Sequence, residues 1–250
     1  MTGVLEFGAL LARLMGYRTL DACVLSTAGG TGLEELQAVL GGRPPTERLI
    51  RDLGPVLSLH AADLFVLAGQ PVPDDLTPVT RNPHWSVSPV VYNTMAMPAE
   101  NRRLLLDAIR AQPLVPREGR GGIDRPYHRY EPGLGAVLLE LTHSRNLNWT
   151  CTAKALYAVT SGRIYLVAST IGGIGRGTVE VTPELVAGFA GLLGIPARDL
   201  AALGGVRLPD DLPPLDPQAA DVAAVIWEAR RLTTAQLEEV HLASRHLAGR

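Results

Sequence analysis

Apolar positions along this chain follow helical rather than strand spacing. Leu10 and Leu14 lie on one face of a helix, and residues 137–141 repeat the same apolar pattern in the second half of the chain. Thr46 and Thr182 each precede a run of helix-forming residues and provide the side-chain oxygen typical of a helix N-cap. These patterns predict an all-α fold.

The second half of the chain repeats the first half. The segment that starts at Gly8 resembles the one that starts at Gly135, and residues 57–78 resemble residues 193–214. Such self-similarity predicts two copies of one structural unit. The second copy is longer by about eight residues, and the glycine-rich stretch 171–178 is the natural place for this insertion. The matched pairs include Cys23 with Cys151, Leu36 with Ile164, Val39 with Val167, Asp63 with Asp199, and Leu67 with Leu203.

Composition and helix punctuation divide the chain into four parts. Residues 1–78 form the first unit, which is acidic, and residues 134–213 form the second unit. Between them, residues 79–133 form a helical linker that includes an arginine-rich arm. Residues 214–250 form the C-terminal helices.

The order of elements in each unit resembles the helix-turn-helix regulators of the lambda-repressor and Cro type, also called XRE-like regulators. The resemblance lies in residues 19–40 and 45–67 of the first unit, and in residues 146–169 and 181–203 of the second unit. It implies two tandem helix-turn-helix units, joined and followed by further helices. It also implies that the third helix of a unit enters the major groove of DNA.

In the second unit, the resemblance places Ser161, Arg163 and Tyr165 at the start of this third helix. The guanidinium of Arg163 could donate two hydrogen bonds to a guanine edge, or it could simply be solvated. The second helix and the glycine-rich stretch would contact phosphates. The candidate DNA-contacting residues of this unit are Arg145, Asn148, Trp149, Thr150, Lys154, Ser161, Arg163, Tyr165 and Arg176.

Charge is distributed unevenly along the chain, although the net charge is only −2. The first unit has five arginines against nine acids, and Glu34 and Glu35 fall on its third helix, where they would repel phosphate. The linker has eight arginines against five acids. Its arm could follow a DNA backbone or enter a minor groove, or it could be an ordinary solvated loop. The candidate DNA contacts in the arm are Arg120, Arg125 and Arg129.

Composition narrows the possible classes of protein. Hydrophobic residues make up 46% of the chain, which is typical of a globular protein, and no apolar run approaches the roughly 20 residues that span a bilayer. We therefore expect a cytoplasmic protein that does not contact membranes. Two cysteines are too few for a disulfide framework, and no spacing of histidines indicates a metal site. We expect no cofactor and no enzymatic activity.

The sequence thus predicts a transcriptional regulator that binds duplex DNA as a homodimer, mainly through the second unit and the linker arm. The acidic first unit would be free to contact a protein partner. The alternative is that both units have lost DNA binding and form a protein-interaction scaffold. A third hypothesis is a small-molecule sensor with its pocket between the two units.

Overall fold

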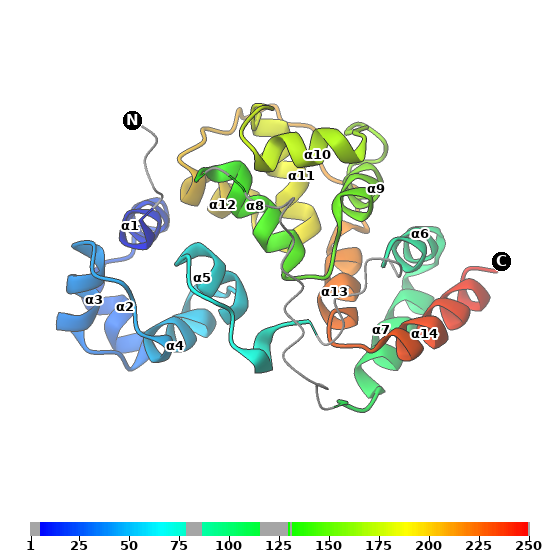
Figure 1. Cartoon of the computed structure of the whole chain (residues 1–250), viewed down its shortest axis with the longest axis horizontal. Helices are drawn as coiled ribbons and strands as arrows, with labels where there is room; N and C mark the ends of the chain where they lie inside the picture. The colour runs from blue at the N-terminus through cyan, green and yellow to red at the C-terminus, as the bar shows by residue number, and fades with distance from the viewer. Residues whose placement is uncertain (1–5, 79–86, 116–129, 131, 250) are drawn as a thin grey trace.

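The computed structural model describes residues 6–78, 87–115, 130 and 132–249. This part of the chain contains fourteen α-helices, one short 3-10 helix and no strand, which confirms the predicted all-α fold (Figure 1). None of these helices is both long enough and apolar enough to cross a membrane.

The first unit contains five helices, which together occupy the lower left of Figure 1. Asp21 caps the second of these helices and Thr46 caps the fourth, so the cap predicted at Thr46 is confirmed. The five helices are α1 (Phe7–Tyr17), α2 (Ala22–Gly29), α3 (Leu33–Leu40), α4 (Glu47–Leu57) and α5 (Ala61–Leu67), and a 3-10 helix follows at Asp74–Leu76.

The second unit repeats this order at the top of Figure 1. Asn148 and Thr182 cap its second and fourth helices, at the positions that correspond to Asp21 and Thr46. The five helices are α8 (Leu134–His143), α9 (Trp149–Val159), α10 (Ala168–Gly175), α11 (Pro183–Leu193) and α12 (Ala197–Gly204).

The insertion in the second unit lies earlier than predicted. Residues 171–178 were expected to hold the extra residues, but α10 occupies most of this stretch. The insertion is instead the connection 160–167 between α9 and α10, which is much longer than the connection between α2 and α3. Leu36 therefore corresponds to Ile171 and not to Ile164, and both Leu36 and Ile171 are fully buried.

Two glycines confirm this corrected register. A Cβ atom on Gly8 would lie 2.1 Å from the carbonyl oxygen of Val39, and a Cβ atom on Gly135 would lie 2.1 Å from the carbonyl oxygen of Ile174. In each unit the first helix thus crosses the end of the third helix at backbone contact, which only glycine permits. Val39 corresponds to Ile174, and its predicted match with Val167 is wrong.

The two cysteines are also not equivalent. Asp21 and Asn148 accept hydrogen bonds from the backbone N–H groups of Val24 and Cys151, so Val24 is the counterpart of Cys151. Cys23 is exposed, whereas Cys151 is buried in the core. The predicted match between the cysteines is therefore wrong.

The linker and C-terminal helices, which the sequence analysis treated as separate parts, form one cluster of four helices. Helix α6 packs on α14 and α7 packs on α13, while α6 and α13 also pack against α9 and α11 of the second unit. Inside the cluster, the Asn93 amide donates a 2.8 Å hydrogen bond to the Ser244 hydroxyl. The four helices are α6 (Ser88–Ala96), α7 (Ala99–Ala111), α13 (Ala219–Ala229) and α14 (Thr234–Leu247).

The repeat continues into this cluster. The buried positions of α6 and α7 recur 135 residues later in α13 and α14, so the pair α6–α7 corresponds to the pair α13–α14. The duplicated unit therefore has seven helices rather than five. The matched buried residues are Val87 with Val222, Val90 with Val225, Val91 with Ile226, Thr94 with Ala229, Met97 with Leu232, Leu105 with Val240, and Ile109 with Ser244.

Candidate functional site: the seam between the units and the α9–α10 face

The two units meet by exchanging helix contacts. Helix α1 of the first unit packs on α12, the fifth helix of the second unit. Reciprocally, α8 of the second unit packs on α5, the fifth helix of the first unit. The first helix of each copy therefore covers the fifth helix of the other, and the pairing is close to two-fold.

A buried ion pair joins the units at the α5–α8 seam. Arg145 donates to both carboxylate oxygens of Asp63, at 2.7 and 2.8 Å, and also donates to the carbonyl oxygen of Leu193 at 2.8 Å. Both side chains of the ion pair are fully buried. The predicted contact between Arg145 and DNA is therefore wrong, because this guanidinium is fully buried and a phosphate cannot reach it.

The α1–α12 seam contains the matching ion pair. Arg18 donates to both carboxylate oxygens of Asp199, at 3.0 and 2.6 Å, and to the carbonyl oxygen of Leu57 at 2.9 Å. The hydrogen bond with Asp199 raises the pKa of Arg18. Arg18 is 127 residues before Arg145, and Asp63 is 136 residues before Asp199, so the two pairs are repeat-related. Sequence reasoning matched the aspartates but did not identify the arginines as their partners.

Trp227 extends the seam into the helix cluster. The His60 ring stacks on it with ring centroids 3.5 Å apart, and the guanidinium carbons of Arg230 and Arg145 lie 3.7 and 5.1 Å from its ring centroid. Burial lowers the pKa of His60 and outweighs the opposing effect of the Asp63 carboxylate, while the positive charges of Arg145 and Arg230 also lower it. Burial likewise lowers the pKa of Arg230 to about 10. This part of the interface therefore favours a neutral histidine.

The start of α9 has a structural role. The Asn148 side chain caps the helix, and the Trp149 indole N–H donates a 2.9 Å hydrogen bond to the Tyr130 hydroxyl. A Cβ atom on Gly172 would lie 2.7 Å from the Trp149 ring, so this ring packs directly on α10. Arg176 is exposed, and its guanidinium carbon lies 5.4 Å from the centroid of the Trp149 ring.

Three of the predicted groove-contacting residues do not lie on the third helix. Ser161, Arg163 and Tyr165 are all in the connection that precedes α10, which corrects their predicted placement. The Ser161 hydroxyl donates to the Asp216 carboxylate at 2.8 Å, and Arg163 lies 3.8 Å from the carboxylate of Glu184. Tyr165 is 78% exposed and contacts the edge of another tyrosine ring.

The remaining candidates lie at the surface of α9 and around the ends of α10. Thr150 and Lys154 are exposed on α9, and Ser169 is exposed in the first turn of α10. No side chain caps α10, and among the described residues the N–H groups of Ala168 and Ser169 have no acceptor, whereas the Thr170 N–H donates to the Val167 carbonyl. Arg120, Arg125 and Arg129 lie outside the described residues.

The charge of this surface differs between the two units. The stretch from α9 through Thr178 contains Lys154, Arg163 and Arg176 and no acidic residue. Its counterpart, residues 22–43, contains two acids, Glu34 and Glu35, and one basic residue, Arg43. We refer to the exposed surface formed by α9, the following connection and α10 as the α9–α10 face.

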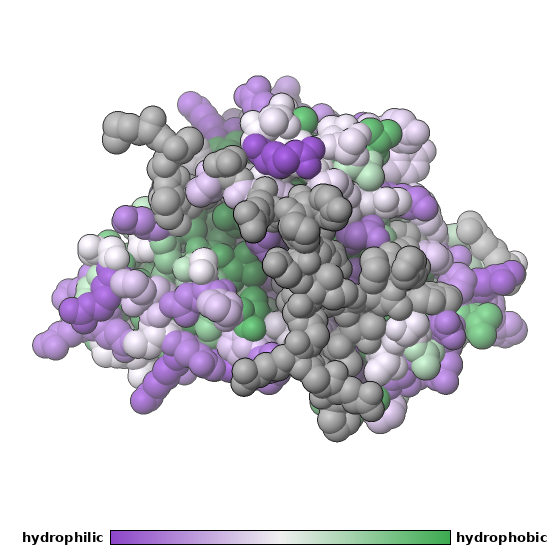
Figure 2. Space-filling model, viewed as in Figure 1, coloured by the Kyte–Doolittle hydropathy of each residue, from purple (hydrophilic) through white to green (hydrophobic). Residues whose placement is uncertain are grey.

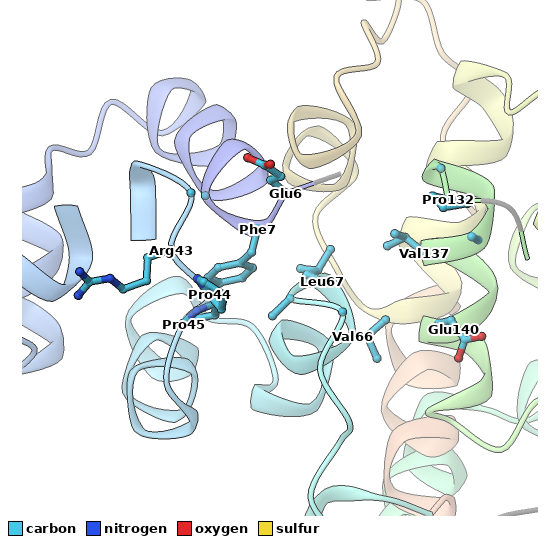
Figure 3. A pocket seen from close by; sticks show the side chains of 16 residues that line it. Glu6, Phe7, Arg43, Pro44, Pro45, Val66, Leu67, Pro132, Val137 and Glu140 are labelled. Carbon is cyan, nitrogen blue, oxygen red and sulfur yellow. The ribbon is translucent and has the colours of Figure 1, made fainter. Parts of the chain in front are cut away.

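A pocket of about 410 Å³ opens where α1, α5 and α8 meet (Figure 3). In Figure 2 a hydrophobic area of the surface lies over α5, at the edge of this opening. In the described part of the chain, no group of three or more His, Cys, Asp or Glu side chains is arranged to hold a metal ion. The residues that line the pocket include Glu6, Phe7, Arg43, Val66, Leu67, Pro132, Val137 and Glu140.

Comparisons with known proteins do not place the chain in a family. No family model matches it, and neither the curated proteins nor the solved structures contain a match. The likeness to the lambda-repressor type of regulator therefore stays a resemblance of sequence pattern.

Proposed function

We propose that this protein is a DNA-binding regulator that contacts duplex DNA through the α9–α10 face of its second unit. The observation that carries the proposal is the charge of this face, which has three basic residues and no acid, in contrast to the matching surface of the first unit. Phosphates attract such a surface, and binding releases the counterions that neutralise the DNA. The N–H groups of Ala168 and Ser169 at the start of α10 are further donors for a phosphate oxygen.

The burial of individual side chains divides the candidate residues by role. Thr150, Lys154, Arg163, Tyr165 and Arg176 are exposed and form the proposed contact surface. Arg145 fixes the seam, while Asn148, Trp149 and Ser161 shape the α9–α10 face through their contacts within the chain. Because its third helix is acidic, the first unit is proposed to meet a protein partner rather than DNA.

A triple variant tests the proposal. In Lys154→Ala/Arg163→Ala/Arg176→Ala, the affinity for duplex DNA, measured by fluorescence polarisation, should fall by more than about tenfold. The matched control is Arg48→Ala/Arg198→Ala/Arg207→Ala, which removes the same charge from exposed positions away from the α9–α10 face. Equal losses in both variants would show that binding is not localised to this face.

The second candidate function is a protein-interaction scaffold without DNA binding. It is favoured by α10 itself, which carries no basic side chain and buries the residues from Ile171 to Gly175. If the unmodified protein fails to bind duplex DNA even at low salt, the scaffold is the better description.

A further inference from the structure

The two seams between the units are related by the repeat, yet one is closed and the other is open. In the closed seam, α1 packs closely along α12. In the open seam, α8 and α5 leave the pocket shown in Figure 3.

Arg13 of α1 bridges the closed seam, and Leu10 lies about one turn before it on the same helix. The Leu10 side chain is 1% exposed. Arg13 donates from Nε and from one Nη to the carbonyl oxygen of Leu203, at 3.1 and 2.9 Å. A guanidinium therefore bridges α1 and the end of α12.

The open seam has a smaller and an oppositely charged residue at these positions. Val137 is the counterpart of Leu10, Glu140 is the counterpart of Arg13, and Leu67 is the counterpart of Leu203. A carboxylate only accepts hydrogen bonds, so Glu140 cannot donate to the Leu67 carbonyl as a guanidinium would. Within the described ranges, no donor forms a hydrogen bond with the Leu67 carbonyl.

Two acidic side chains and one basic side chain line the pocket. Glu6 and Glu140 both line it, while the side chain of Arg43 extends away from the cavity (Figure 3). Val137 and Glu140 project from α8 beside Val66 of α5. Glu140 also has another interaction within the chain, so a ligand would share this carboxylate rather than meet a bare charge.

We propose that the pocket binds a small alkylguanidinium cation. Its head group donates to the Glu140 carboxylate and to the Leu67 carbonyl, and its alkyl chain packs against Val66 and Val137. The ligand thereby replaces the guanidinium that Arg13 provides in the other seam. This proposal concerns the seam between the units and does not depend on DNA binding.

Calorimetric titration of the full chain with n-butylguanidinium tests the proposal. Binding is expected, together with a rise in Tm, because the ligand stabilises the folded state that holds it. The neutral isostere n-butylurea should bind about tenfold more weakly or not at all, since it lacks the charge that strengthens hydrogen bonds to a carboxylate. Equal affinity for both compounds, or no binding of n-butylguanidinium, would overturn the proposal.

Two variants connect the binding to this seam. Glu140→Gln should weaken binding of n-butylguanidinium by about tenfold, whereas the control Glu239→Gln, an exposed substitution on α14, should leave it unchanged. The double variant Val137→Leu/Glu140→Arg restores the residues of the closed seam, so it should raise Tm without ligand and abolish binding. A double variant that still binds with unchanged affinity would place the ligand elsewhere.

Discussion

At the residue scale, the buried ion pair Arg145–Asp63 is the contact on which the seam depends most. Arg145→Met leaves the Asp63 carboxylate buried without its partner, and we expect a loss of about 3–5 kcal/mol in the free energy of unfolding. Arg18→Met removes the repeat-related pair. The side chain of Arg18 is 21% exposed, so water can reach the unpaired Asp199 carboxylate and the loss in the free energy of unfolding should be smaller. Urea denaturation followed by circular dichroism measures both losses.

The double variant Asp63→Leu/Arg145→Met is the control for this prediction. Removing both charges avoids the uncompensated carboxylate, so its loss should be smaller than that of Arg145→Met alone. If the loss of the double variant equals the sum of the losses of Asp63→Leu and Arg145→Met, the two side chains do not interact energetically.

His60 makes a pH-dependent contribution at the same scale. Its pKa in the folded state lies below the ordinary value of 6.5, because burial disfavours the charged ring by more than the Asp63 carboxylate favours it. The unfolded chain then binds more protons as the pH falls through 6.5, so this contribution to stability is present above that pH and is lost below it. Urea denaturation at about pH 7.5 and about pH 5.5 should show the decrease, and His60→Leu should reduce it. An equal decrease in this variant would assign the effect to other groups.

At the scale of helices, Gly8 and Gly135 determine how the first helix of each unit packs. Gly8→Ala or Gly135→Ala places a methyl group against a backbone carbonyl, and each should cost about 3 kcal/mol or more. Gly16→Ala, also in α1, has nothing within 4 Å of the added Cβ and should stabilise the protein by about 0.5–1 kcal/mol. Thermal denaturation of the three variants checks the prediction, which fails if all three behave alike.

The sequence was sufficient for the helical class, the repeat and the caps, because these depend on local spacing and on residue types near one another in the chain. The start of α10 was not predictable in this way. Ser161 and Gly162 both adopt positive φ angles, 51° and 84°, which end α9 and begin an extended connection where the repeat suggested a helix. The role of Arg145 depends on a partner 82 residues away, and nothing in the local pattern distinguishes a buried guanidinium from an exposed one.

At the scale of the whole molecule, the internal pairing changes what we expect of self-association. The sequence led us to expect a homodimer, but the α1, α5, α8 and α12 surfaces already pair within one chain. We now expect one chain per particle, with a mass of 26.7 kDa in sedimentation equilibrium. A mass twice as large would mean that a further surface outside these seams joins two chains.

The central claim is that the second unit contacts DNA through the α9–α10 face and the first unit does not. The salt dependence of DNA binding tests this claim most directly. We would measure the affinity of the full chain for duplex DNA by fluorescence polarisation across a range of salt concentrations. If the three cations of the α9–α10 face each neutralise a phosphate, log K should fall with log salt with a slope about 3 units steeper than that of Lys154→Ala/Arg163→Ala/Arg176→Ala. Identical slopes for the two proteins, or no binding at low salt, would contradict the account.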